Sequence, residues 1–186
     1  EATGPIKSKL HPRLSTGAKW IWMVYLLLTV ACILSYKLCG MGWFDSFNYS
    51  MTSTATGGFA TESGSIMTFH SPAEEYVCTI FCFLSGINFT LLYTSVSGLK
   101  IGQLFRNSEF RFYSAMVACF TLFIMLELIF NRSYEVEHAF RSSVFQVVSF
   151  ITTTGLFSDD AAKWPHVTWV VLAACMPYHS CSGSTS

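Results

Sequence analysis

Charge is scarce in this sequence. Charged side chains make up 12% of the 186 residues, about half of the roughly 25% that is usual in soluble domains. The formal net charge is zero, so the chain lacks the basic excess that is typical of nucleic-acid-binding proteins. Hydrophobic residues make up 52% of the chain, and the mean hydropathy is +0.44. This composition excludes an ordinary soluble globule and predicts a protein embedded in a lipid bilayer.

Patterns that would indicate catalysis or metal binding are also missing. The seven cysteines are scattered, with no CxxC pair and no histidine at ligand spacing, so we interpret them as small buried apolar residues. Glu74 and Glu75 resemble a catalytic carboxylate pair. They follow Ser71 and Pro72 at a predicted helix start, however, where acidic residues interact favourably with the helix dipole. We therefore expect neither an enzyme nor a cofactor.

Four long apolar segments dominate the chain instead. Residues 20–38, 76–96 and 112–130 are each long enough to cross a bilayer, which takes about 20 apolar residues in a helix. The fourth segment, residues 167–178, is short and contains Pro177, so we expect a half-span or a broken helix there. Glu127 lies near the end of the third segment, from which its carboxylate is expected to reach the membrane interface.

The distribution of basic residues predicts the orientation. Basic side chains gather before the first apolar segment and between the second and the third, which marks both regions as cytoplasmic. These residues are Lys7, Lys9, Arg13, Lys19, Lys100, Arg106 and Arg111. We expect residues 1–18 to be a cytoplasmic N-terminal segment and residues 99–110 a cytoplasmic loop of a multi-pass inner-membrane protein. Since the chain starts with Glu1 and ends in a Ser/Gly stretch, we expect it to be part of a longer polypeptide.

The two outer connections share an unusual pattern. Each contains a moderately apolar stretch that is too short to span, at residues 43–51 and 139–151, and threonines and glycine follow at once. A short helix that enters the membrane and returns as extended chain would have this pattern. Such backbone is tolerated at membrane depth only where protein or water covers it.

The same pattern occurs twice at a fixed distance. Residues 44–59 can be laid over residues 141–156 with an offset of 97 residues, which places Gly58 on Gly155 and Thr56 on Thr153. The offset also lays the first long segment over the third. The sequence therefore predicts an all-α integral membrane fold built from tandem repeats of helix, re-entrant pore loop and helix. One repeat covers residues 19–98, and a second, truncated one covers residues 111–186.

The Thr/Gly segments have the chemistry of a potassium filter. Potassium filters replace the hydration shell of the ion with rings of backbone carbonyls. Glycine permits the unusual backbone angles that such rings need, and threonine adds a hydroxyl and a stiff β-branched side chain. A short helix that ends at the filter presents the negative end of its dipole to the cation.

At these residues the chain resembles the Trk/Ktr/HKT potassium transporters, and within them the TrkH-like subunits. The resemblance covers nearly the whole chain. Its specific motifs are Glu-Ala-Thr-Gly-Pro at residues 1–5, Phe44-Asp-Ser-Phe47, Thr56-Gly-Gly-Phe-Ala-Thr61, Phe145-Gln-Val-Val148, Thr152-Thr-Thr-Gly155 and Cys181-Ser-Gly-Ser-Thr185.

The resemblance implies a potassium uptake protein in which four repeats surround one pore, of which this chain holds the second and most of the third. It also implies two filter strands and an intramembrane gate loop beneath them. The filter residues would be Thr56, Gly57, Gly58, Phe59, Thr153, Thr154, Gly155 and Leu156, and the gate loop would include Ser182, Gly183 and Ser184. The transported ion would be K⁺. The implied partners are the remaining repeats, a cytoplasmic nucleotide-binding regulatory subunit and a second copy in a homodimer.

Two alternatives stay open at the level of sequence. A two-pore-loop potassium channel that dimerises would need a complete helix after the second Thr/Gly segment, which the expected break at Pro177 disfavours. A membrane-embedded enzyme, such as an intramembrane protease, would need a buried Ser/His or Asp/Asp pair on facing helices, and the sequence suggests none.

Overall fold

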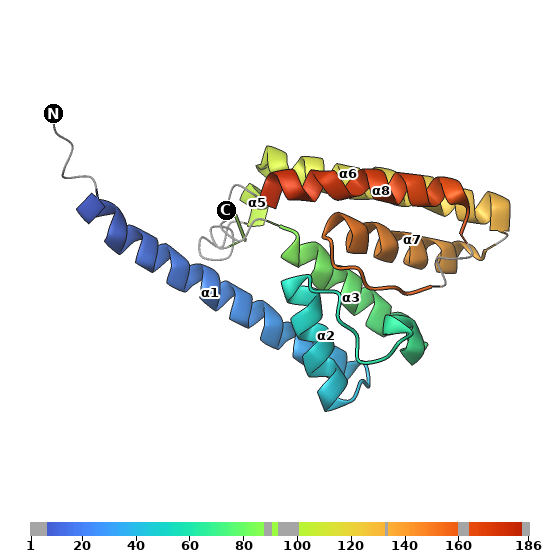
Figure 1. Cartoon of the computed structure of the whole chain (residues 1–186), viewed down its shortest axis with the longest axis horizontal. Coiled ribbons are helices and arrows are strands. Elements are labelled where there is room, and N and C mark those ends of the chain that lie inside the picture. Colours follow the sequence, from blue (N-terminus) through green and yellow to red (C-terminus); the bar gives the residue numbers. More distant parts are fainter. Residues whose placement is uncertain (1–6, 88–90, 93–100, 133, 160–163, 184–186) are drawn as a thin grey trace.

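The computed structural model describes residues 7–87, 91–92, 101–132, 134–159 and 164–183, and no strand occurs among them. Figure 1 shows the helices in chain order. They are α1 (Lys7–Leu38), α2 (Trp43–Ala55), the 3₁₀ helix η1 (Ser65–Phe69), α3 (Pro72–Ser85), α5 (Ile101–Arg106), α6 (Ser108–Arg132), α7 (Val136–Ile151) and α8 (His166–Gly183).

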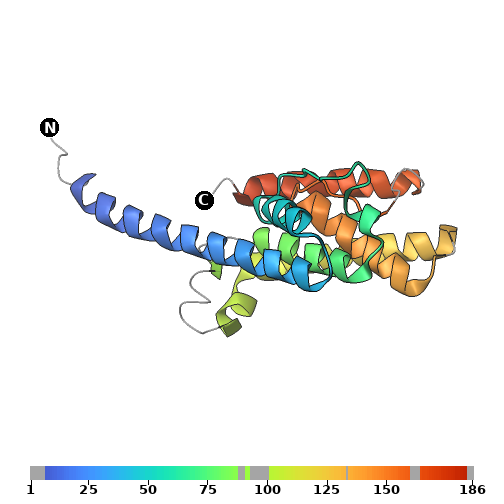
Figure 2. The ribbon, with the colours of Figure 1, turned by 90° about the horizontal axis from the view of Figure 1, so that it is seen from below.

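The helices form two copies of one arrangement. In the first copy α1, α2 and α3 all contact one another, and in the second copy α6, α7 and α8 do the same. The copies meet where α3 packs against α7, so α3 lies at the centre of the molecule (Figures 1 and 2). The predicted all-helical repeat is therefore confirmed, with the short helices α2 and α7 at matching places.

In the described part of the chain, two helices are suited to cross a membrane by length and composition. Lys19–Leu38 of α1 and Ser108–Asn131 of α6 are long and apolar enough, and in each only 22% of the apolar window is buried inside the chain. The predicted spans 20–38 and 112–130 lie within these two stretches. Most of their apolar surface is thus free to contact lipid or further protein, as expected for a membrane-spanning helix.

The other two apolar segments differ from the prediction. Within the expected span at residues 76–96, helix α3 ends at Ser85 and residues 91–92 are again helical, while residues 88–90 and 93–100 lie outside the described part of the chain. The expected break at Pro177 is wrong, because α8 continues through it to Gly183. Proline removes one backbone hydrogen bond from a helix, but neighbouring groups often compensate for the loss in membrane helices.

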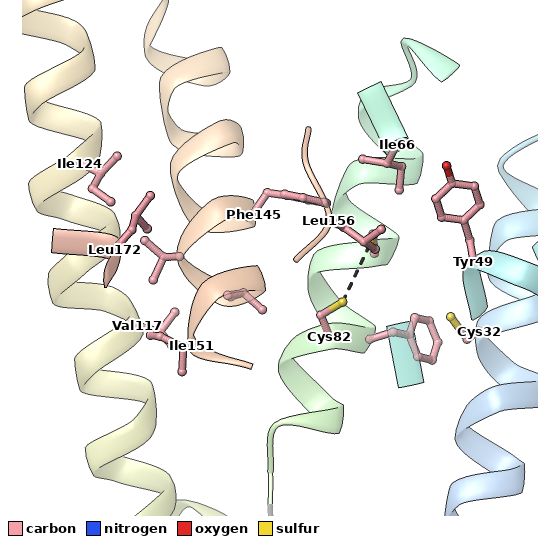
Figure 3. Packing of buried hydrophobic residues seen from close by; sticks show 14 of the residues in the cluster. Cys32, Tyr49, Ile66, Cys82, Val117, Ile124, Phe145, Ile151, Leu156 and Leu172 are labelled. Atoms are coloured by element: carbon pink, nitrogen blue, oxygen red, sulfur yellow. Dashed lines mark hydrogen bonds between the residues drawn. The ribbon is translucent and has the colours of Figure 1, made fainter. Parts of the chain in front are cut away.

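The hydrophobic core is one cluster that extends through both copies. Figure 3 shows Leu156 of the second Thr/Gly segment among buried residues that include Phe145 of α7 and Cys82 of α3. Cys32, Cys78 and Cys82 are buried there, as the sequence predicted. Cys119 is exposed, contrary to expectation, because it lies on α6, whose apolar surface is mostly uncovered in this chain.

An ion pair joins the two copies at their centre. Arg141 of α7 donates from Nε to Oε2 of Glu75 on α3 at 2.9 Å, and from Nη1 to Glu137 at 2.8 Å. The side chains of Arg141 and Glu75 are only 11% and 9% exposed. Glu74 and Glu75, which resemble a carboxylate pair in the sequence, therefore have different surroundings. Glu75 binds Arg141 of α7, while the buried Oε2 of Glu74 has no hydrogen-bond partner among the described residues.

The two neighbouring glutamates should respond in opposite ways to the same substitution. Burial raises the pKa of Glu75, although Arg141 opposes that shift. Because Glu75→Gln deprives the buried Arg141 of this charge partner, we expect it to lower the free energy of unfolding by about 1–3 kcal/mol at pH 7.5. Burial, together with nearby Asp45, raises the pKa of Glu74 above its ordinary value. The folded state therefore disfavours the ionised form of Glu74, and Glu74→Gln should stabilise the protein at pH 7.5.

The pH dependence provides the control. The cost of ionised Glu74 starts to fall as the pH drops through its raised pKa, and it is gone below the ordinary pKa of the unfolded state, where both states carry the protonated acid. The advantage of Glu74→Gln should therefore shrink on acidification. Thermal unfolding of both variants in detergent at pH 7.5 and at acidic pH measures this. A loss of stability in Glu74→Gln at pH 7.5 would contradict the assignment.

Candidate functional site

The two Thr/Gly segments have the same backbone conformation. Thr56 and Thr153 have φ values of 50° and 57°, and Gly58 and Gly155 have φ values of 74° and 76°. These four residues form two pairs at the 97-residue offset of the sequence repeat. Left-handed threonines are uncommon because a β-branched side chain is strained there. Finding that conformation twice at matching positions indicates a built structure rather than an ordinary loop.

Matching hydrogen bonds hold both segments to the end of their short helices. The amide of Gly57 donates to the carbonyl of Thr52 at 3.0 Å, and the amide of Thr154 donates to the carbonyl of Ser149 at 2.9 Å. These bonds occupy carbonyls that a helix C-terminus would otherwise leave free. Each segment thus leaves its helix through the same tight turn.

The same conformation leaves carbonyls of both segments without a hydrogen bond. Left-handed residues at positions 56 and 58 flank Gly57, whose φ is outside the left-handed range. The left-handed residues end the helix, so the carbonyls beyond it do not accept the bonds of a continuing helix. In the described residues no hydrogen bond reaches the carbonyls of residues 56–58 or 153–155. Both segments therefore present free carbonyl oxygens, which are suitable ligands for a hard monovalent cation.

The two segments approach each other closely. A Cβ atom added to Gly58 would collide with the carbonyl oxygen of Thr154. Farther along, the amide of Phe157 donates to the hydroxyl of Ser65 at 3.1 Å. The first segment and the residues that follow it therefore lie against the second segment, as two neighbouring walls of one structure would.

The end of α3 fits between the two walls. Its Ser85 hydroxyl donates to the carbonyl of Ser53, at the end of α2, at 3.0 Å. The next residue is Gly86, where an added Cβ would lie 2.8 Å from Cγ2 of Thr152 and 2.6 Å from the hydroxyl of Tyr113. The absence of a side chain at Gly86 therefore lets the C-terminal ends of both short helices pack near α3.

The residue after each filter glycine has different surroundings. Phe59 is 80% exposed, whereas Leu156 is 1% exposed. Leu156 is buried because α3 and α7 lie behind the second wall (Figure 3), while the side chain of Phe59 is left uncovered by the described chain. The predicted filter residues are thus brought together as two walls, although only the second wall is fully backed by this chain.

Electrostatics at the walls come from the backbone alone. Residues 52–59 and 149–157 contain no charged side chain, so the negative ends of α2 and α7 and the free carbonyls provide the attraction for a cation. No group of three or more His, Cys, Asp or Glu residues that could hold a resident metal occurs in the described part of the chain.

The predicted gate residues have a different conformation from the one expected. Ser182 and Gly183 belong to the last turn of α8, and Ser184 lies outside the described residues. The expected loop is therefore helical as far as Gly183, and the role of these residues as a gate stays a prediction.

Two residues beside the walls were missed from the sequence. The hydroxyl of Thr52 donates to the carbonyl of Phe59 at 2.7 Å, and that of Ser149 donates to the carbonyl of Leu156 at 2.9 Å. The repeat alignment contained a signal for both, because the 97-residue offset places Thr52 on Ser149, one hydroxyl over another.

Comparison with known proteins identifies a family. The profile of the family described as "TrkH: Cation transport protein" matches residues 2–186. The crystal structure of the potassium transporter TrkH from Vibrio parahaemolyticus is similar with a TM-score of 0.84 and 33% sequence identity, and the match covers 88% of this chain and 36% of that one.

Curated relatives agree with this match. The Trk system potassium uptake protein TrkH of Halomonas elongata is 36% identical over 186 residues, and TrkH of Escherichia coli K12 is 36% identical over 187. TrkG of Escherichia coli K12 is also 36% identical. Each match covers 100% of this chain but only 38–39% of the relative. The chain therefore spans about two fifths of the length of these proteins.

The contact at Gly86 gives a test of how the walls are supported. Gly86→Ala places a methyl group against Thr152 and Tyr113, so we expect overpacking to lower the free energy of unfolding by about 1–3 kcal/mol. Gly102→Ala is the matched control, because nothing lies within 4 Å of its added Cβ. Chemical unfolding of both variants in detergent measures the difference, and equal stabilities would refute the close packing at α3.

Proposed function

Since this chain belongs to the TrkH cation transport protein family, we propose that it forms two neighbouring walls of a potassium pore within a longer polypeptide. The observation that carries the proposal is the pair of Thr/Gly segments, which have left-handed residues at matching positions and carbonyls without hydrogen bonds. Potassium uptake is the function in the names of the relatives. The two strands provide this chain with the kind of oxygen ligands that such a function needs.

The proposed path uses the backbone for both binding and selectivity. A potassium ion sheds water at the mouth and exchanges it for carbonyl oxygens of Thr56–Gly58 and Thr153–Gly155. The negative ends of α2 and α7 lower the energy of the dehydrated cation. The ion then moves down its electrochemical gradient. Selectivity for K⁺ over Na⁺ would be moderate, because each wall has one filter glycine in place of a full Thr-Val-Gly-Tyr-Gly run.

The surroundings of the pore follow from the same proposal. Residues 1–18 and 99–110 would face the cytoplasm, with the two walls near the outer side of the inner membrane. Residues 19–98 and 111–186 would be two repeats, and the remaining repeats of the polypeptide would complete the ring. A cytoplasmic nucleotide-binding subunit and a second copy of the protein would be its partners. Residues 182–184 would form part of an intramembrane gate, with its first residues helical.

The filter glycines provide the decisive test. A serine at Gly58 or Gly155 would have to adopt a left-handed conformation, at a cost of about 1–3 kcal/mol. A change of about 1.4 kcal/mol alters an equilibrium tenfold. We therefore expect Gly58→Ser and Gly155→Ser in the full-length protein to lower the K⁺/Na⁺ uptake ratio about tenfold in cells without other potassium uptake systems.

Gly102→Ser serves as the control for a glycine-to-serine change, because Gly102 lies on α5 with open space around it. Its uptake ratio should equal that of the wild type. Protein levels in the membrane are measured in parallel by immunoblot. If both filter variants reach the membrane and keep the wild-type ratio, the two strands do not select the ion.

A further inference from the structure

The last carbonyl of each wall differs from the three before it. Those of Phe59 and Leu156 accept hydrogen bonds from the hydroxyls of Thr52 and Ser149, at 2.7 and 2.9 Å. The carbonyls of residues 56–58 and 153–155 accept none in the described part of the chain. The four-residue filter expected from the sequence is thus divided in both walls at the same point.

The direction of these bonds has a consequence for the ion. A donor prefers to lie near the lone-pair directions of a carbonyl oxygen. The hydroxyl donors belong to α2 and α7, behind the walls, and their residues are 6% and 2% exposed. The carbonyls of Phe59 and Leu156 therefore turn back toward their own short helices. A carbonyl in that orientation is poorly placed for an ion that passes in front of the free carbonyls.

We propose that Thr52 and Ser149 are positioning residues that set the outer limit of the filter. Each wall then offers the ion three carbonyls, and the carbonyl of the fourth residue fixes the strand to its helix. The inference rests on the proposed potassium pathway. It also explains why a hydroxyl residue occurs at the same position in both repeats, although threonine and serine differ in shape.

The hydrogen bonds from Thr52 and Ser149 also support the strained part of each wall. Gly58 and Gly155 are left-handed. The next residue in each wall, Phe59 or Leu156, has the carbonyl that accepts the hydrogen bond from the short helix. Anchoring that residue to the helix keeps the strand from relaxing out of the left-handed conformation. Loss of the hydroxyl should therefore affect ion selection by the free carbonyls, even though the hydroxyl does not touch the ion.

Carbonyl NMR on the reconstituted full-length protein tests the geometry directly. The steps Gly58-Phe59 and Phe59-Ala60 are the only Gly-Phe and Phe-Ala steps in this sequence. Labelling with ¹³C-carbonyl glycine and ¹⁵N-phenylalanine reports the carbonyl of Gly58, and ¹³C-carbonyl phenylalanine with ¹⁵N-alanine reports that of Phe59. A Phe59→Leu variant removes both signals and so assigns them among any from the rest of the polypeptide.

The expected result is a different response of two adjacent carbonyls. Replacing K⁺ with Na⁺ should shift the Gly58 carbonyl resonance and leave the Phe59 resonance in place. Thr52→Val keeps the shape but loses the donor, so the Phe59 resonance should move upfield. Thr52→Ser should restore its position. A Phe59 carbonyl that responds to the ion as strongly as Gly58, or that ignores Thr52→Val, overturns the inference.

Uptake measurements connect the geometry to function. Thr52→Val and Ser149→Ala should each lower the K⁺/Na⁺ uptake ratio severalfold, and Thr52→Ser and Ser149→Thr should retain it. Ser50→Ala is the matched control, because the Ser50 hydroxyl donates to Phe47 within α2 and does not reach the wall. Failure of the proposed function is distinguishable, since then neither carbonyl would respond to ion exchange and Gly58→Ser would leave the ratio unchanged.

Discussion

The structure depends on a constraint on backbone carbonyls. A protein that uses them as ligands must leave them without hydrogen bonds at a depth where unpaired polar groups are costly. Here the carbonyls of residues 56–58 and 153–155 accept no hydrogen bond from the described residues, whereas those of Phe59 and Leu156, which follow them, do. The carbonyls of Thr52 and Ser149 accept hydrogen bonds from the amides of Gly57 and Thr154. Their hydroxyls donate to the carbonyls of Phe59 and Leu156. One residue in each short helix therefore binds its wall through both its carbonyl and its hydroxyl.

The position of α3 follows from the same constraint. Strained strands persist only where the surrounding structure holds them, and α3 contacts the supports of both walls. Its first turn carries Glu75, which pairs with Arg141 of α7, and its end carries Ser85, which binds α2. Gly86 then allows close approach to Thr152. The sequence suggests that α3 is part of a simple membrane span. In the structure this helix connects the two repeats.

Much of this architecture could be predicted from the sequence because it is periodic. The 97-residue offset placed the short helices and the glycines that follow them correctly, since hydrophobic pattern and glycine position are local signals. The prediction failed where distant contacts decide. Pro177 appears as a break because proline removes a hydrogen bond, yet α8 continues through it. The pairing of Arg141 with Glu75 joins residues 66 positions apart, and no local pattern distinguishes Glu75 from Glu74.

The two walls differ in a way that the repeat itself explains. Gly58 has the carbonyl of Thr154 against it, while Gly155 has open space, and Leu156 is buried while Phe59 is exposed. The second wall provides the neighbour for Gly58, and α3 of the first repeat provides the cover for Leu156. If each repeat stands in the same relation to the next, Gly155 and Phe59 lack neighbours only because those belong to other repeats. In the proposed pore, the unfilled places would then be contact surfaces for the further repeats of the longer polypeptide.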